Sequence, residues 1–207
     1  MKTPAEIQEW FGGIDIYLFD QLMKGNIAPG MKVLDAGSGA GRNLVYFMRS
    51  GYDVAAVDES EAMIGRVRQL AKLIAPQVSE QNFRVESVEK MSFDDASFDV
   101  VLSSAVLHFA RDEEHWQAMV DEMWRVLKPG GMFFCRLSST IGMETQVQLI
   151  NGRRYLLPDG VDWFLVDAEK LKEVTKSLGG EFVEPIKTTV VDSKRAMTTW
   201  VVRKAGD

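Results

Sequence analysis

The sequence predicts an α/β fold in which helices cover both faces of a mostly parallel sheet, and three observations lead to this prediction. Apolar, β-branched runs alternate with amphipathic segments over residues 31–137, a rhythm typical of right-handed crossover units. The run 98–103 is apolar enough for a strand that is buried on both faces, as in a parallel sheet. A chain of 207 residues is long enough to bury one such core.

Local signals set the boundaries of the predicted elements. The turn pair Pro29-Gly30 precedes the first strand, and a glycine cluster follows it. Ser60 is a predicted helix N-cap, and the cationic and helix-breaking residues 128–131 end a long amphipathic helix. The predicted strands are 31–36, 53–57, 83–87, 98–103 and 132–137, and the predicted helices are 43–50, a segment that begins at Ser60, and 113–127.

After residue 137 the pattern changes to short strands. The apolar runs 155–157 and 163–166 flank the turn 158–160, which predicts a small β-hairpin insert within residues 138–166. The last predicted elements are a helix over 168–178, capped by Asp167, and two strands over 182–191 and 197–203. The turn at 192–195 makes these two strands antiparallel. We expect residues 1–28 to form cap helices and residues 1–207 to form a single domain.

The composition narrows the functional class. Apolar residues make up 46% and charged residues 26% of the sequence, as in an ordinary globular protein. The net charge of −6, without a long basic run, disfavours nucleic acid as a partner. The sequence has no apolar stretch of about 18 residues and no signal-peptide core, so we expect a cytoplasmic protein that acts on a small molecule and does not enter a membrane. The single cysteine, Cys135, excludes an intrachain disulfide and a thiolate metal cluster, and we predict no metal site.

A glycine-rich segment follows the first predicted strand and precedes a helix. Gly37, Gly39 and Gly41 permit positive φ and let a ligand approach the backbone, and the helix N-terminus beyond them suits an anionic group. The alternative is a tight turn with a structural role only. A dinucleotide fingerprint would need glycine where Arg42 stands, which argues against a nicotinamide cofactor.

Asp58 ends the second predicted strand. An acidic side chain at that place can accept hydrogen bonds from both hydroxyls of an adenosine ribose. The alternative role is to cap the helix that follows, for which Ser60 is better placed. We therefore predict that Asp58 binds a ribose.

Four segments together resemble the motif series of the class I S-adenosylmethionine-dependent methyltransferases: VLDAGSGAGRN, VDES, SFDVVLSSAVLHF and WRVLKPGG. They cover about residues 30–137 in the order and spacing of the family. The resemblance implies a Rossmann-like, seven-stranded sheet whose last strand is antiparallel, with S-adenosyl-L-methionine as the cofactor. Within the family the chain most resembles the tellurite-resistance and small-molecule methyltransferases, because of the GRN sequence, the hairpin insert and the ending TTWVVRK.

The resemblance also implies roles for residues along the cofactor. Asp35, Gly37 and Gly39 would lie along its methionine part, with Arg42 beside them, and Asp58 would hold the ribose.

The adenine would lie between the residues after the second and third strands. Met63 would pack on its face, although a place in an ordinary helix stripe is the alternative. The backbone of Val88 and Glu89 would meet its edge, and Ser87 stands where members of the family commonly have aspartate. Ser103 and Ser104 end the fourth strand, where backbone carbonyl groups would accept from the ammonium group of the cofactor.

Methyl transfer depends more on alignment and exclusion of water than on side-chain chemistry, because the sulfonium carbon is already activated. If the acceptor enters protonated, His108 is the predicted general base, with a buried structural histidine as the alternative. His115 begins a helix and is expected at the surface. Tyr17, where the family has its cofactor-covering helix, is the second predicted catalytic residue, and packing on the sheet edge is its alternative role.

We expect the acceptor pocket above the carboxyl ends of the strands. Its predicted walls come from the segments before the first strand, after the fourth and after the fifth: Trp10, Phe11, Tyr17, His108, Arg154, Tyr155 and Trp163. The charge of Arg154 would suit an anionic acceptor. The alternative is that Arg154 is a solvated loop arginine without a role in binding. Two other functions stay open, a non-catalytic module that binds S-adenosylmethionine and a nicotinamide oxidoreductase.

Overall fold

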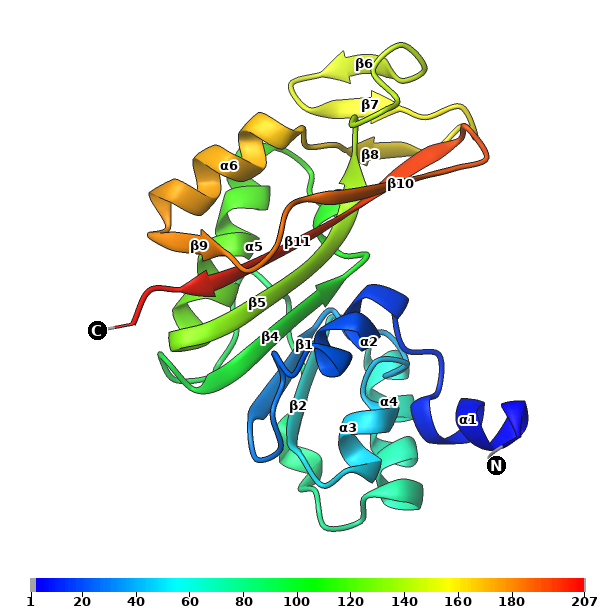
Figure 1. Cartoon of the computed structure of the whole chain (residues 1–207), viewed down its shortest axis with the longest axis vertical. Helices are drawn as coiled ribbons and strands as arrows, with labels where there is room; N and C mark the ends of the chain where they lie inside the picture. The colour runs from blue at the N-terminus through cyan, green and yellow to red at the C-terminus, as the bar shows by residue number, and fades with distance from the viewer. Residues whose placement is uncertain (1–2, 207) are drawn as a thin grey trace.

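A central sheet with helices on both faces organises the structure, a computed structural model that describes residues 3–206 (Figure 1). The strands are β1 (Lys32–Ala36), β2 (Asp53–Asp58), β3 (Phe83–Val85), β4 (Phe98–Ser104), β5 (Leu127–Ser139), β6 (Gln148–Asn151), β7 (Arg154–Leu156), β8 (Asp162–Phe164), β9 (Gly180–Phe182), β10 (Lys187–Val191) and β11 (Arg195–Lys204). The helices are α1 (Pro4–Phe11), α2 (Ile16–Met23), α3 (Val45–Arg49), α4 (Glu61–Ile74), α5 (Glu113–Val126) and α6 (Ala168–Ser177), with short 3-10 helices at Glu80–Asn82 and Leu107–Phe109.

The strand order of the main sheet is β10-β11-β5-β4-β1-β2-β3, and β9 also pairs with β11. β1, β2, β3, β4 and β5 pair in parallel. β11 runs antiparallel to β5, β9 and β10. The predicted Rossmann-like fold with an antiparallel last strand is therefore confirmed. Within residues 3–206 the sheet has eight strands instead of the predicted seven, because β9 pairs with β11. The order reverses at β1, where ligands bind in open α/β sheets.

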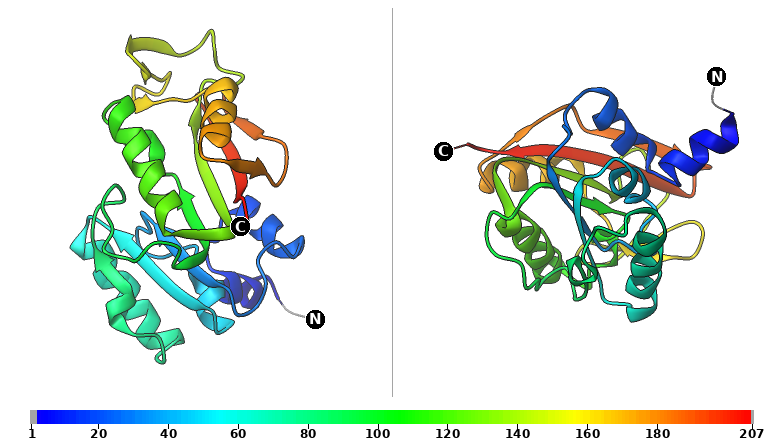
Figure 2. Two further views of the ribbon diagram at one scale, coloured as in Figure 1. Left: turned by 90° about the vertical axis from the view of Figure 1, so that its left-hand side faces the viewer. Right: turned by 90° about the horizontal axis from the view of Figure 1, so that it is seen from below.

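Each core strand sends alternate side chains into two separate apolar clusters. From β1, Leu34 joins the cluster under α5 and α6, whereas Val33 joins the cluster under α2, α3 and α4. Figure 2 shows these two helix layers on opposite sides of the sheet. The apolar runs of the sequence follow from this arrangement, because strands covered on both faces need apolar residues at successive positions.

The predicted helix caps are present. The side chain of Ser60 accepts a hydrogen bond from the Met63 N–H at the start of α4, and Asp167 accepts one from Lys170 at the start of α6. Such caps satisfy backbone donors that have no partner within the helix.

Several predicted boundaries differ from the structure, each for a local reason. The predicted strand 182–191 is divided into β9 and β10, and Pro185 in the gap lacks the N–H that a continuous strand would need. β5 begins at Leu127, before the predicted 132–137. The predicted hairpin β7–β8 is present, but β6 adds a third strand. All four residues of β6 are exposed, and the strand therefore lacks the alternating apolar pattern that would reveal it.

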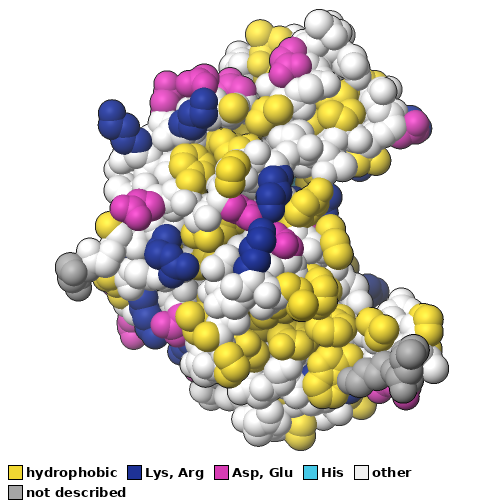
Figure 3. All heavy atoms as spheres, in the orientation of Figure 1, with side chains coloured by type: hydrophobic (Ala, Val, Ile, Leu, Met, Phe, Trp, Pro, Cys, Tyr) yellow, Lys and Arg dark blue, Asp and Glu magenta, His cyan; other side chains and the backbone are white. Residues whose placement is uncertain are grey.

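The insert β6–β8 and the helix α1 stand at two ends of the molecule (Figure 1). Figure 3 shows that the surface between them is hollowed on one side, with hydrophobic side chains along the rim, and β4 ends beside this hollow in Figure 1. Within residues 3–206, none of the helices has the length and apolar character of a membrane span.

Substitution of Trp200 tests the packing of the sheet against α5 and α6. Its fully buried ring stacks on Trp116, with 6.4 Å between the centroids, and its Nε1 donates to Thr175 Oγ1 at 2.9 Å. Trp200→Ala should lower the free energy of unfolding by about 3–5 kcal/mol in urea titrations. Leu73→Ala, at a side chain that is 81% exposed, is the control and should change it by less than about 0.5 kcal/mol. Equal effects of the two substitutions would contradict this description of the core.

Candidate cofactor site

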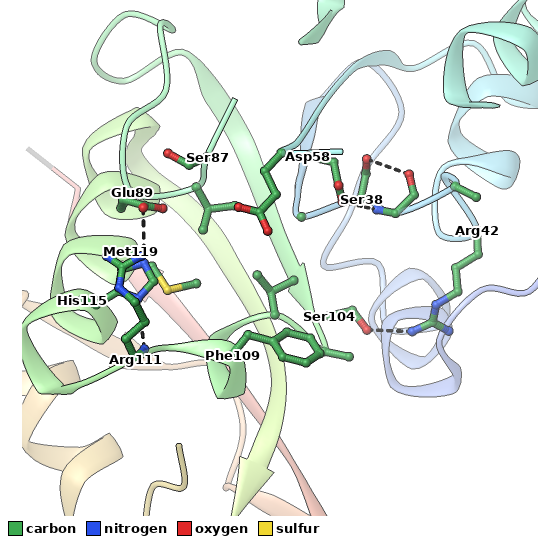
Figure 4. A pocket seen from close by; sticks show the side chains of 17 residues that line it. Ser38, Arg42, Asp58, Ser87, Glu89, Ser104, Phe109, Arg111, His115 and Met119 are labelled. Atoms are coloured by element: carbon green, nitrogen blue, oxygen red, sulfur yellow. Dashed lines mark hydrogen bonds and ion pairs between the residues drawn. The ribbon is translucent and has the colours of Figure 1, made fainter. Parts of the chain in front are cut away.

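A cavity of about 660 Å³ lies at the carboxyl ends of the parallel strands (Figure 4). Its walls come from the glycine segment after β1, from Asp58 at the end of β2, from Ser87 after β3 and from Ser104 at the end of β4. The volume lies in the range of pockets that enclose small molecules and cofactors. A second cavity, lined by α6 and the β9–β10 connection, contains none of the residues predicted to form the site.

The cavity brings together six of the predicted cofactor residues: Gly37, Gly39, Arg42, Asp58, Val88 and Glu89. The other predicted residues, Asp35, Met63, Ser103, His108 and Tyr17, are not among those that line it. The contacts of all these residues with a cofactor stay predictions.

The glycines at 37 and 39 meet different needs. Gly37 has φ +80°, and a Cβ there would lie 2.5 Å from a Val106 methyl group, so this glycine is required by packing. Gly39 has φ +52°, and a Cβ there would meet no atom within 4 Å. Because Gly39 lines the cavity, its open side is the place where a ligand can approach the backbone. The structural and ligand-binding interpretations of the glycine segment therefore apply to different residues.

The Asp58 carboxylate ties the glycine segment to the end of β2. Its Oδ2 accepts from the Gly39 N–H at 2.8 Å, and its Oδ1 accepts from the Ser60 N–H at 3.0 Å. A carboxylate oxygen can accept more than one hydrogen bond, so both oxygens keep capacity for ribose hydroxyls. The capping role and the predicted ribose role are compatible in this geometry.

Asp35 is a buried carboxyl group beside the cavity-lining residues. It is 2% exposed, and its Oδ2 has no hydrogen-bond partner among residues 3–206. Burial raises the pKa of Asp35 to about 7; the charge of Arg42 lowers it, and the charge of Asp58 raises it. An unpaired carboxyl of this kind suits a ligand that brings a positive charge, as the methionine part of S-adenosylmethionine does.

Arg42 connects the glycine segment to the linker between α1 and α2. Its Nη1 donates to the Gly13 carbonyl at 3.2 Å, and its Nη2 donates to Ser104 Oγ at 2.9 Å. The guanidinium thus supplies a positive charge at the end of the cavity near the helix that follows the glycines (Figure 4). This placement is compatible with the predicted role beside the carboxylate of the cofactor.

The opposite end of the cavity holds residues that the sequence did not reveal. His115, expected at the surface, lines the cavity together with Arg111 and Met119. His115 Nδ1 accepts from the Arg111 N–H at 3.1 Å, so Nε2 carries the proton, and Nε2 lies 3.3 Å from Glu89 Oε1. His115 and Met119 are four residues apart on α5 and share a face, a spacing that could have indicated their common direction.

His108 lies behind the exposed Phe109, which lines the cavity. It is 2% exposed, its ring centroid lies 4.2 Å from that of Trp163, and its Nδ1 accepts from the Ser138 N–H at 3.4 Å. Burial, and then the charge of Arg195, lowers the pKa of His108 to about 4, so the ring is neutral at pH 7. Nδ1 is an acceptor here and Nε2 carries the proton, so action as a base requires a change of tautomer. The predicted catalytic role stays a prediction.

The other predicted pocket walls have partners of their own. The Tyr17 hydroxyl lies 2.6 Å from Thr189 Oγ1. The Phe11 ring stacks on Tyr46, with 5.2 Å between the centroids. Arg154 donates to the Ala110 carbonyl at 3.0 Å and pairs with Asp162 at 2.8 Å, so the charge suggested for an anionic acceptor is matched within the insert.

Comparison with known proteins identifies the family of this fold and site. Residues 34–135 match a family profile described as a methyltransferase domain. An uncharacterized methyltransferase of Synechocystis is 37% identical over 117 residues, which are 56% of this chain and 51% of the relative. A tRNA 5-carboxymethoxyuridine methyltransferase of Escherichia coli is 29% identical over 102 residues, which are 49% of this chain and 38% of that protein. The matched segment thus spans about half or less of these relatives.

A solved structure has the same fold over nearly the whole chain. It is the 1,6-didemethyltoxoflavin N1-methyltransferase of Burkholderia thailandensis, with 1,6-didemethyltoxoflavin and S-adenosylhomocysteine bound. The TM-score is 0.68 at 19% identity, and the alignment covers 99% of this chain and 92% of the other.

Residues 34–135 are therefore similar to a methyltransferase domain, and nearly the whole chain has the fold of a solved methyltransferase structure. S-adenosyl-L-methionine is the predicted cofactor: the cavity offers the open side of Gly39 and the Asp58 carboxylate, and the buried, unpaired carboxyl of Asp35 is next to the residues that line it.

Asp58 and Gly39 test the placement of the cofactor. Asp58→Ala should weaken binding of S-adenosylhomocysteine by about 1.5–3 kcal/mol in calorimetry, because charge-assisted hydrogen bonds are lost. Gly39→Val should weaken it further, since the side chain would enter the open space beside the loop. Glu61→Ala is the control, at an exposed residue of α4 that does not line the cavity, and it should keep the wild-type affinity. Wild-type affinity in the Asp58 variant would refute the ribose assignment.

Asp35 predicts a pH dependence of cofactor binding. In the free site the pKa of Asp35 is about 7, so its carboxyl is partly protonated near neutral pH. The cationic amino group of the ligand binds more tightly to the ionised carboxyl. Affinity for S-adenosylhomocysteine should therefore fall as the pH drops below about 7. Binding of the ligand should release a proton, and calorimetry in two buffers of different ionisation enthalpy measures this release. Asp35→Asn should remove the dependence, and the control His115→Gln should keep it. A wild-type affinity that stays constant between about pH 5.5 and 7.5 would contradict this assignment.

Proposed function

We propose that this chain transfers a methyl group from S-adenosylmethionine to a small-molecule acceptor. The observation that carries the proposal is the cavity in which the open side of Gly39, the Asp58 carboxylate and the carboxyl ends of β1, β2 and β4 meet. The bound cofactor would supply an activated methyl carbon. The protein would then hold the acceptor in line with that carbon and keep water away.

The small-molecule acceptor is supported by the charge and shape of the protein. A net charge of −6 does not favour the phosphate backbone of a nucleic acid. On the face that Figure 3 shows, hydrophobic side chains, rather than a continuous band of Lys and Arg, follow the rim of the hollow between the insert and α1. We therefore propose the helices of residues 1–28 and the insert of residues 138–166 as covers of the acceptor entrance within one methyltransferase domain.

The proposed cofactor contacts follow the predicted ones. Asp35 and Arg42 would hold the methionine part, Met63 and Val88 would pack on the adenine, and carbonyl groups at Ser103 would accept from the ammonium group. Ser103 is wholly buried and is not among the residues that line the cavity, whereas the next residue, Ser104, is.

For the acceptor we propose His108 and Tyr17 as the residues that handle a proton. The neutral state of His108 supports this role, because a protonated imidazole could not accept one. The Tyr17 hydroxyl lies 2.6 Å from Thr189 Oγ1, and either oxygen can be the donor of this hydrogen bond.

A turnover assay tests the proposed function. The protein is incubated with S-adenosylmethionine labelled in the methyl group and a panel of thiol, amine, hydroxyl and carboxylate acceptors, and S-adenosylhomocysteine is measured by mass spectrometry. We expect acceptor-dependent product in the wild type and strongly reduced product in Asp58→Ala. Tight cofactor binding without turnover on any acceptor would instead support a non-catalytic binding module.

His108→Gln tests the proposed base. With an acceptor found in the assay, kcat should fall by about 10²-fold or more, while affinity for S-adenosylhomocysteine stays unchanged. The control Leu73→Ala, at an exposed residue of α4, should retain kcat. If His108→Gln lowers the melting temperature but leaves kcat and its pH profile intact, the role of His108 is structural.

A further inference from the structure

Arg136 stands near the carboxyl end of β5, next to the cofactor cavity. On the neighbouring strand its register partner is Ser104, which lines the cavity. Alternate residues of a strand share a face, and Phe134 packs in the apolar cluster that contains Leu18 of α2. The Arg136 side chain points to the same side, beneath the start of α2, where the acceptor entrance is proposed.

One edge of the Arg136 guanidinium is fixed by the protein. Nη1 donates to Asp15 Oδ2 at 2.7 Å, and the Asp15 side chain is wholly buried. The guanidinium carbon lies 5.3 Å from the centroid of the Tyr17 ring. These contacts orient the planar group, since a cation over an aromatic face and a charge-assisted hydrogen bond both restrict it.

The other edge of the guanidinium has no partner. Nε is buried and makes no hydrogen bond, and Nη2 has no hydrogen-bond partner within residues 3–206. Thr199 lies opposite Arg136 in the β5–β11 register, and its Oγ1 is also buried without a partner. Residues directly opposite each other on paired strands share a face, so Thr199 and Arg136 extend from the same face of the sheet.

The charges around Arg136 favour an anion. Arg136 and Arg42 face the same buried carboxylate, with Nη1 at 2.7 Å and Nη2 at 3.8 Å from Asp15 Oδ2, respectively. Asp15 thus has two guanidinium groups within ion-pair distance, and the charge of Arg42 also acts on the buried carboxyl of Asp35. The parallel N–H bonds of a free Nε/Nη2 edge match the two oxygens of a carboxylate.

We propose that the Nε/Nη2 edge of Arg136, with Thr199 beside it, anchors a carboxylate group of the methyl acceptor. The inference rests on the proposed function and names its substrate class, a small molecule that carries a carboxylate. Arg136 is then a residue that determines acceptor specificity, whereas Arg154, paired within the insert, is not.

Matched carboxylate and carboxamide probes test this proposal. Binding of benzoate and benzamide, and of phenylacetate and phenylacetamide, is measured by ligand-observed NMR and calorimetry on protein loaded with S-adenosylhomocysteine. The wild type should prefer each carboxylate by about tenfold or more, the scale of a bidentate charge-assisted contact. Arg136→Gln should lose the preference, and Arg136→Lys, which keeps the charge without the fork, should retain part of it.

Arg203→Gln is the control, because Arg203 lies on β11 and donates to the Gly130 carbonyl away from the site. It should bind all four probes as the wild type does, and every variant should keep its affinity for S-adenosylhomocysteine. Equal binding of carboxylates and carboxamides by the wild type, or a preference that survives in Arg136→Gln, overturns the proposal.

The turnover assay separates this inference from the proposed function. Methyl transfer confined to acceptors without a carboxylate would keep the proposed function and overturn the role of Arg136. Carboxylate binding that depends on Arg136 in a protein without turnover on any acceptor would keep the anion site and overturn the proposed function.

Discussion

The hydrogen bond from the Gly39 N–H to Asp58 is the interaction on which the site depends. It joins the loop after β1 to the end of β2 and holds the open side of Gly39 toward the cavity. The strand order places the two groups near each other, because β1 lies between β2 and β4 in the sheet. The chain connections that leave β1 run to opposite sides of it, which opens a space at the carboxyl ends of these strands. Without this tie, the glycine segment would have many conformations to lose when a ligand binds.

Charge in the site is arranged around buried carboxyl groups. Asp35 is unpaired at the end of β1, whereas Asp15 is shared by two guanidinium groups at the start of α2. A buried unpaired carboxyl favours a cation, and a carboxylate with two cationic partners leaves room for a second anion. The cationic amino group of the cofactor would pair with Asp35, and an anionic acceptor would pair with the guanidinium groups next to Asp15. These two pairings are the electrostatic basis of the two proposals.

Much of the fold could be predicted because it depends on local patterns. The apolar runs of β1, β2 and β4 and the caps Ser60 and Asp167 act within a few residues, and they predicted elements that the structure contains. β6 was not predicted, because its residues are exposed and its sequence has no apolar pattern that would indicate pairing with β7.

The site was predictable where a motif is contiguous and unpredictable where it is assembled by tertiary contacts. Gly37, Gly39 and Asp58 could be found from their places at strand ends, and the structure brings them into one cavity. His115 was expected at the surface, and only the packing of α5 against the loop after β3 turns it toward Glu89. The free edge of Arg136 depends on Asp15, distant in the sequence, so the strand pattern could not reveal it.

A crystal structure with S-adenosylhomocysteine tests the central claim most directly, namely that this cavity holds the cofactor. The account predicts both ribose hydroxyls within hydrogen-bond distance of the Asp58 carboxylate, and the amino acid part of the ligand along Gly37 and Gly39 near Asp35. A ligand seated in the cavity beside α6, or a ribose that makes no contact with Asp58, would contradict it.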